Sequence, residues 1–181
     1  MTTSSTTLRV LKVVFQGDIK FYELPAFRGA IVDKIGRDHR LFHNHKPTDG
    51  FYYRYPLIQY KIINSHPAIM CMGEGVEEIH HFFAHQDWTL TIGEQEKPLD
   101  IHKLDMHEFS LQMQNPLKTY SLLNWVALNQ KNYQAYRNME SLAEQLSFLE
   151  RILRGNILAF AKGVGWHIEE PVQINIKRIL N

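Results

Sequence analysis

The first 92 residues alternate between short runs rich in β-branched residues and stretches with helical periodicity, and this order constrains the fold most strongly. A helix is predicted over residues 24–35, with Pro25 in its first turn and Gly36 just past its end. A second helix is predicted over residues 74–85. Strands are predicted at residues 8–15, 53–63, 68–72 and 88–92. The order β-α-β-β-α-β is that of a ferredoxin-like, or RRM-like, module.

The second half of the chain predicts a different arrangement, which begins after a polar linker over residues 93–103. A helical region is predicted from about residue 129 to 162, and within it Ser141 and Glu144 have the spacing of a capping box. Strands are predicted at residues 107–113, 118–123 and 172–179. We therefore expect an α+β protein with a ferredoxin-like domain over residues 8–93 and a divergent α+β domain over residues 104–181.

Composition excludes several classes of protein. The chain is 44% hydrophobic and 22% charged, which is typical of a globular protein and not of a disordered one. A single cysteine, Cys71, excludes a disulfide framework and a cysteine-based zinc finger. No apolar run approaches the roughly 18 residues of a membrane span, and the first residues lack the features of a signal peptide. We expect a cytoplasmic protein that does not interact with a membrane.

The net charge is only +1, but it is unevenly distributed along the chain. Residues 1–61 have ten Lys or Arg against five Asp or Glu, whereas residues 62–110 have two against nine. Residues 111–181 are basic again, with eight against five. Such polarity lets a nearly neutral chain present a basic face to a polyanion, although chance variation between segments explains it equally well.

The stretch from Gly36 to His45 concentrates three histidines and two arginines between a helix and a turn. If His43 and His45 are locally extended, their side chains point the same way, with Cα atoms roughly 7 Å apart. Two imidazoles so placed can share an acid–base reaction, in which one accepts a proton and the other donates one. Arg37 and Arg40 are candidates to hold a phosphate beside them. The alternative is a pair of surface loop histidines without a role.

A rival site lies on the second predicted helix. Glu77, His81 and His85 are spaced at i, i+4 and i+8, which would place them on one stripe of a continuous helix. A carboxylate and imidazoles one turn apart can bind zinc or another divalent metal. The sequence contains no HExxH motif, so the alternative is an amphipathic helix with a histidine-rich polar face.

Aromatic and basic side chains are mixed in the Tyr52-Tyr-Arg-Tyr55 stretch and again at Tyr60 and Lys61. Aromatic side chains on an exposed sheet can stack on bases, and basic ones can contact phosphates, although ordinary packing also explains the tyrosines. Backbone amides of the segment from Lys162 to Gly165 could approach an anion, but a glycine helix cap explains it as well.

Several strings, taken in order, resemble a known family. They are Phe27-Arg-Gly-Ala30, Phe42-His-Asn-His45, Tyr55-Pro-Leu-Ile-Gln-Tyr-Lys61, Gly73-Glu-Gly75 and Arg154-Gly-Asn-Ile-Leu-Ala-Phe-Ala-Lys-Gly163. Together they resemble the CRISPR RNA-processing endoribonucleases, the sixth CRISPR-associated protein family, in the form typical of subtype I-B. The resemblance covers residues 8–179.

The resemblance implies two ferredoxin-like modules that bind CRISPR repeat RNA and cut it once, without metal or other cofactor. The RNA's own 2′-hydroxyl attacks, which leaves a 2′,3′-cyclic phosphate and a 5′-hydroxyl. The family's catalytic histidines correspond to His43 and His45. Candidate RNA-binding residues are Arg28, Lys34, Arg37, Arg40, Lys46, Tyr52, Lys61, Arg154 and Lys162.

Two other functions stay open from the sequence. One is an RNA-binding subunit that retains the processed guide without cutting, and the other is a metal-dependent enzyme centred on Glu77, His81 and His85. Other CRISPR-associated proteins of an effector complex are further candidate partners, and a homodimer stays open too.

Overall fold

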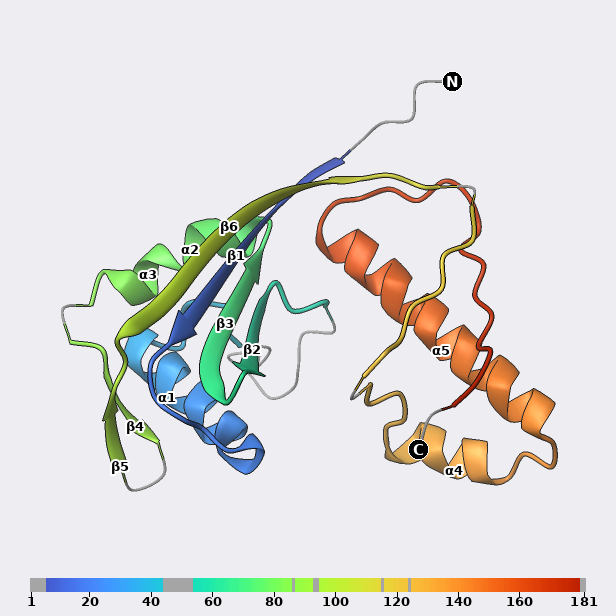
Figure 1. Ribbon diagram of the computed structural model, residues 1–181, viewed down its shortest axis with the longest axis horizontal. Coiled ribbons are helices and arrows are strands. Elements are labelled where there is room, and N and C mark those ends of the chain that lie inside the picture. Colours follow the sequence, from blue (N-terminus) through green and yellow to red (C-terminus); the bar gives the residue numbers. More distant parts are fainter. Residues whose placement is uncertain are drawn as a thin grey trace. The chain divides into compact units, whose positions relative to one another are not determined.

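The computed structural model describes residues 6–43, 54–85, 87–92, 95–114, 116–123 and 125–179. The chain divides into two compact units, Met1–Gln112 and Met113–Asn181 (Figure 1). In the described part of the chain, no helix is both long and apolar enough to cross a membrane.

The N-terminal unit is built on a four-stranded antiparallel sheet with the order β2-β3-β1-β6 (Figure 1). Its strands are β1 (Thr6–Phe15), β2 (Ile58–Ile63), β3 (His66–Met72) and β6 (Ile101–Leu111). In the described residues, a 3₁₀ helix and one α-helix lie between β1 and β2, and two short helices follow β3. This is the ferredoxin-like topology that the sequence predicts, within an α+β protein.

The fourth strand of this sheet is not the predicted one. Residues 89–92 form β4 (Thr89–Ile92), which pairs with β5 (Gln95–Pro98) in a separate hairpin. Strand β6 pairs with β1 instead. Because β6 has eleven residues and β4 has four, β6 can form hydrogen bonds with far more of the backbone groups of β1. The first unit therefore extends to Gln112, beyond the predicted domain end at residue 93.

Helices cover one face of this sheet (Figure 1). Helix α1 (Leu24–Ile35) follows the short 3₁₀ helix η1 (Phe21–Glu23) and spans the predicted residues. The helix predicted over residues 74–85 is present as α2 (Glu74–Glu78) and α3 (His80–Phe83). The residue between them, Ile79, has a right-handed helical backbone.

The hydrophobic core lies between the sheet and these helices. Helix α1 buries Phe27, Ile31 and Ile35 on successive turns, as the apolar periodicity predicts. The ring of Phe15, on β1, lies edge-on to Phe27 at 6.3 Å and to Phe82 at 5.8 Å between ring centroids. The core therefore fixes both ends of α1 and the position of α3 against the central strand.

Glycine is required where α2 approaches the chain that leads into β2. A Cβ atom on Gly75 would lie 2.8 Å from the backbone carbonyl oxygen of Leu57. No L side chain fits there without moving the backbone, so Gly75 determines how closely α2 packs against the sheet.

The C-terminal unit contains α4 (Gln130–Arg137) and α5 (Leu142–Gly163). The predicted cap of α5 is present, since the Ser141 hydroxyl accepts the Glu144 backbone N–H at 3.2 Å. The Glu144 carboxylate in turn accepts the N–H of Glu140, also at 3.2 Å, and not that of Ser141 as in a standard capping box.

The described residues of this unit form no strand, which corrects the prediction of strands at 118–123 and 172–179. The second segment runs along α5 instead. Arg154 Nε donates to the carbonyl of Val172 at 2.9 Å, and the Ile176 N–H donates to Glu150 Oε1 at 2.9 Å. Alternate residues of the segment are half-buried, as the period-two pattern predicts. The segment forms these hydrogen bonds with side chains of α5 and not with a neighbouring strand.

Candidate functional site

Residues 36–43, the segment after α1, contact strand β2 of the sheet. Gly36 ends the helix with a φ of 99°, which turns the chain out of its helical path. Phe42 is fully buried, and its carbonyl accepts the Tyr60 hydroxyl of β2 at 3.1 Å. Burial raises the pKa of Tyr60 well above its usual value, so this hydroxyl stays protonated and remains a donor. The segment is therefore packed into the core and not a free surface loop.

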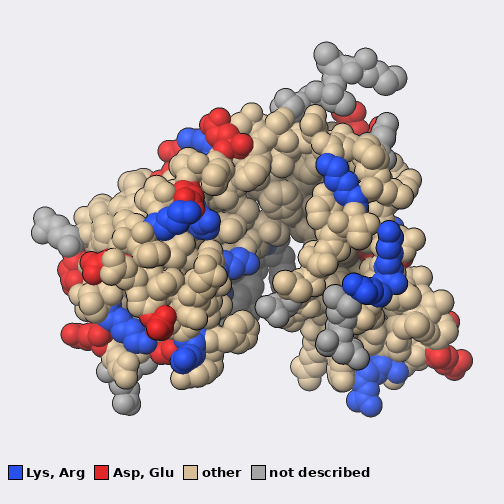
Figure 2. Space-filling model, in the orientation of Figure 1, with Lys and Arg blue, Asp and Glu red and all other residues tan. Residues whose placement is uncertain are grey.

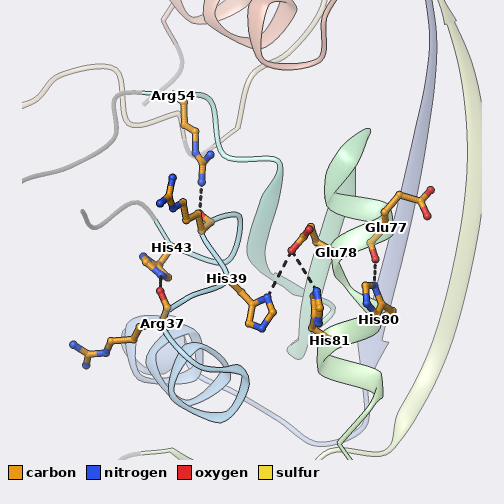
Figure 3. Close-up of polar contacts among 9 residues, drawn as sticks. Arg37, His39, His43, Arg54, Glu77, Glu78, His80 and His81 are labelled. Carbon is orange, nitrogen blue, oxygen red and sulfur yellow. Dashed lines mark hydrogen bonds and ion pairs between the residues drawn. The ribbon is translucent and has the colours of Figure 1, made fainter. Parts of the chain in front are cut away.

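His43 is buried in this segment, with only 8% of its surface exposed. Its Nε2 atom lies 2.7 Å from the carbonyl oxygen of Arg37 (Figure 3). Because a carbonyl only accepts hydrogen bonds, Nε2 carries the hydrogen, and in the neutral ring the lone pair is on Nδ1. His43 is therefore not a surface side chain, and its role stays a prediction.

Three of the predicted site residues lie outside the described part of the chain. They are His45, Lys46 and Tyr52. The pairing of His43 with His45 stays a prediction.

Two predicted phosphate-binding arginines lie around this segment. Arg37 is 83% exposed, and its guanidinium is 3.5 Å from Asp33 one helical turn earlier. An exposed contact of this kind is weak, so Arg37 can turn toward an anion at little cost. The carbonyl of Arg40 accepts a hydrogen bond from Arg54, which fixes the backbone there (Figure 3).

Lys34 has a structural position that the sequence did not predict. Its Nζ donates to the carbonyl of Thr89 at 2.8 Å and lies 3.5 Å from Asp87, and only 17% of its side chain is exposed. Lys34 therefore fixes the β4–β5 hairpin to α1. This use of its ammonium group weakens the prediction that Lys34 contacts RNA.

The other predicted contacts are mostly exposed. Arg28 lies on α1, Lys61 on β2 and Lys162 in the last turn of α5, and each is exposed to solvent. Arg154 is also exposed, although its Nε hydrogen bond to Val172 limits its freedom. On the face drawn in Figure 2, Lys and Arg are interspersed with Asp and Glu over the N-terminal unit and do not form one basic patch.

His39 of this segment forms a cluster with Glu78 and His81. Glu78 Oε2 is 3.8 Å from His39 Nδ1 and 3.8 Å from His81 Nε2 (Figure 3). The two imidazole rings pack with their centroids 3.9 Å apart. All three side chains are half-buried, and their nearest ligand atoms lie within 4.8 Å of one another. The cluster joins the segment after α1 to helices α2 and α3.

The predicted metal stripe of Glu77, His81 and His85 does not come together. Glu77 forms an ion pair with Arg9 of β1, and Figure 3 shows it directed away from His81. The carboxylate that lies near His81 is that of Glu78, three positions earlier, with Oε2 3.8 Å from Nε2. Among the described residues the cluster of His39, Glu78 and His81 is found instead.

Partial burial lowers the pKa of His81, and the neighbouring histidines His39 and His80 lower it further. The Glu78 carboxylate acts in the opposite direction but does not compensate. His81 therefore favours its neutral form, whose nitrogen lone pair can act as a ligand or accept a hydrogen bond.

Two protein-family models match this chain. The Cas6b N-terminal domain matches residues 6–110, and the Cas6b C-terminal domain matches residues 112–181. The chain belongs to the Cas6b family. The junction of the two Cas6b domains agrees with the structural division after Gln112, and it assigns β6 to the first.

Solved Cas6b structures share this fold. A crystal structure of Cas6b superposes with a TM-score of 0.72 at 27% identity, over 95% of this chain and 80% of that one. A crystal structure of the CRISPR RNA processing endoribonuclease Cas6b superposes with a TM-score of 0.54 at 22% identity, over 91% of this chain and 73% of that one. The Methanocaldococcus jannaschii protein MJ0978 is 32% identical over 74 residues, which cover 41% of this chain and 49% of that protein.

Sequence reasoning missed the roles of His39 and Glu78 in this Cas6b chain. Both stand beside residues that were singled out, but they meet through the tertiary fold, 39 positions apart. The concentration of histidines in the two segments was the available signal. It did not indicate which side chains meet.

Proposed function

We propose that this chain is a metal-independent endoribonuclease that cuts CRISPR repeat RNA. Its membership of the Cas6b family over both domains supports the proposal, as does the activity for which one structural relative is named. The substrate's 2′-hydroxyl attacks the adjacent phosphorus, the bond from phosphorus to the 5′-oxygen breaks, and a 2′,3′-cyclic phosphate and a 5′-hydroxyl result. The reaction needs a base for the 2′-hydroxyl and an acid for the leaving 5′-oxygen.

The buried hydrogen bond of His43 supports the proposal, in which this side chain is the base. The bond to the Arg37 carbonyl requires a hydrogen on Nε2, so Nδ1 is the basic nitrogen of the neutral ring, and we assign it the proton of the 2′-hydroxyl. The carbonyl fixes the tautomer and the ring orientation, which is one of the two effects of the carboxylate in a catalytic triad. His45 is then the proposed acid that protonates the leaving oxygen.

The phosphate is proposed to be held by the arginines near His43. Arg37 is exposed and only weakly paired, so it can form two parallel hydrogen bonds with phosphate oxygens. Arg40 is exposed on the same segment. Contacts from Arg28, Lys46, Tyr52, Lys61, Arg154 and Lys162 along the RNA are part of the same proposal, whereas Lys34 is assigned to the hairpin.

The test is incubation with repeat RNA from the CRISPR array of the host, in excess EDTA, followed by analysis of both product ends. We expect a single cut, a 2′,3′-cyclic phosphate and a 5′-hydroxyl. Substrate with a 2′-deoxy nucleotide before the cut should stay intact, because the nucleophile is missing. Tight binding without any cut would instead support the alternative of a guide-retaining RNA-binding subunit.

A further inference from the structure

The cluster of His39, Glu78 and His81 has the composition and geometry of a transition-metal site. Two imidazole nitrogens and one carboxylate oxygen are a ligand set that zinc uses in proteins, with a fourth position left to water. Bonds of about 2.1 Å at tetrahedral angles put neighbouring ligand atoms about 3.4 Å apart. Glu78 lies 3.8 Å from each histidine and all three ligand atoms lie within 4.8 Å of one another, so the side chains would have to move closer together to bind one ion.

The charge of the cluster selects the kind of ligand. A carboxylate lies 3.8 Å from each imidazole, so an anion such as a phosphate would be repelled by Glu78. A soft or borderline divalent cation would be attracted to it, and imidazole ligands favour zinc over magnesium or calcium. Within the part of the chain that the structure describes, no fourth His, Cys, Asp or Glu joins the group.

The placement of the cluster indicates what a bound cation would do. His39 lies on the segment that carries His43, whereas Glu78 and His81 lie on α2 and α3 (Figure 3). A cation bound by all three residues would therefore link this segment to α2 and α3, which only the tertiary fold brings close to it. Such a link stabilises the folded arrangement of the segment, because the unfolded chain does not hold the three ligands together.

We propose that His39, Glu78 and His81 form a binding site for one zinc-class divalent cation, which fixes the His43 segment to α2 and α3 and takes no part in the cleavage step. The site is separate from the atoms that the proposed reaction uses. Cleavage in EDTA and cation binding here are thus independent expectations.

The test uses the full chain without RNA, after metal removal by dialysis against a chelator. Zn²⁺ is titrated calorimetrically, and Co²⁺ is added in parallel because its visible absorption reports a tetrahedral nitrogen and oxygen environment. We expect one equivalent to bind, a higher midpoint of thermal unfolding, and slower amide hydrogen exchange over residues 37–43.

Variants identify the ligands. Loss of an outer-shell partner typically costs 10- to 100-fold in metal affinity, so His39→Ala, Glu78→Gln and His81→Ala should each weaken binding by about 100-fold or more. Glu77→Gln and His85→Ala are controls that change a carboxylate and a histidine of the same helical region outside the cluster, and they should bind as the wild type does.

Two results would overturn the proposal. One is the absence of Zn²⁺ binding by the folded wild-type chain. The other is unchanged affinity in the three ligand variants, which would mean that other histidines, such as the stacked pair His66 and His102, bind the metal. Both measurements are made without substrate, so neither depends on whether the chain cleaves RNA.

Discussion

His43 has a structural contact and a proposed chemical role, and two substitutions separate them. His43→Ala removes the ring and leaves the Arg37 carbonyl without the donor that lies 2.7 Å away. His43→Gln keeps an amide N–H at about the reach of Nε2, so that it can still donate to this carbonyl. Glutamine has no group that accepts a proton near neutral pH, so the proposed base is lost in both variants.

The expected size of each effect follows from the burial of this residue. An acceptor left unpaired in a buried position costs about 1–3 kcal/mol, and a chain of this size loses roughly 2–4 °C in midpoint for each kcal/mol. His43→Ala should therefore unfold at least about 2 °C below the wild type, while His43→Gln should stay closer to it. Cleavage should fall by about 100-fold or more in both, the scale of a lost general base.

The assays are thermal unfolding by circular dichroism and single-turnover cleavage of labelled repeat RNA, with His85→Ala as a control histidine outside the segment. Single-turnover conditions separate the chemical step from product release. Near-wild-type cleavage by His43→Gln would refute the role of His43 as the base. An unchanged midpoint for His43→Ala would refute the argument from the buried hydrogen bond.

Two further predictions concern packing and RNA contact. Gly75→Ala should lower the free energy of unfolding by about 1–3 kcal/mol in chemical denaturation, because the new methyl group meets the Leu57 carbonyl. Gly29→Ala, inside helix α1, places its methyl group where nothing lies within 4 Å, so it should raise the free energy of unfolding by up to about 1 kcal/mol. The reverse order of stability would contradict the packing of α2. Arg37→Ala should reduce the slope of log affinity for repeat RNA against log salt by about 0.7, the value for one phosphate contact on a single strand, and Lys103→Ala on β6 should leave it unchanged. Equal slopes for wild type and Arg37→Ala would remove Arg37 from the RNA contacts.

The parts of the fold that depend on local pattern could be predicted from the sequence. The stripe of Phe27, Ile31 and Ile35 indicates both α1 and its buried face, and the Ser141 cap indicates the start of α5. The fourth strand was misassigned because β6 is an edge strand with several polar and exposed positions, and it does not alternate cleanly. The short run at residues 89–92 does alternate, although it pairs only within its own hairpin.

The site was predictable only in part, because its contacts join distant segments. Histidine density indicates the segment after α1 as a candidate site, but the buried hydrogen bond of His43 depends on how the chain turns at Gly36. The cluster of Glu78 with His39 and His81 joins α2 and α3 to a residue that precedes Glu78 by 39 positions, and helical periodicity does not reveal such a contact. Lys34 was predicted to contact phosphate because no local pattern in the sequence shows that its ammonium group donates to a carbonyl of the β4–β5 hairpin.

The bond from Tyr60 to the Phe42 carbonyl ties the His43 segment to β2, which stands at one end of the strand order. Terminal strands of a sheet open by local fluctuation more readily than central ones, since only one neighbour holds them. The opening of β2 would release the tyrosine hydroxyl and remove one contact that holds residues 36–43, while β1 and β3 could stay paired. The candidate site is therefore coupled to the fraying of one outer strand, so amides of the segment and of β2 should exchange ahead of those in β1.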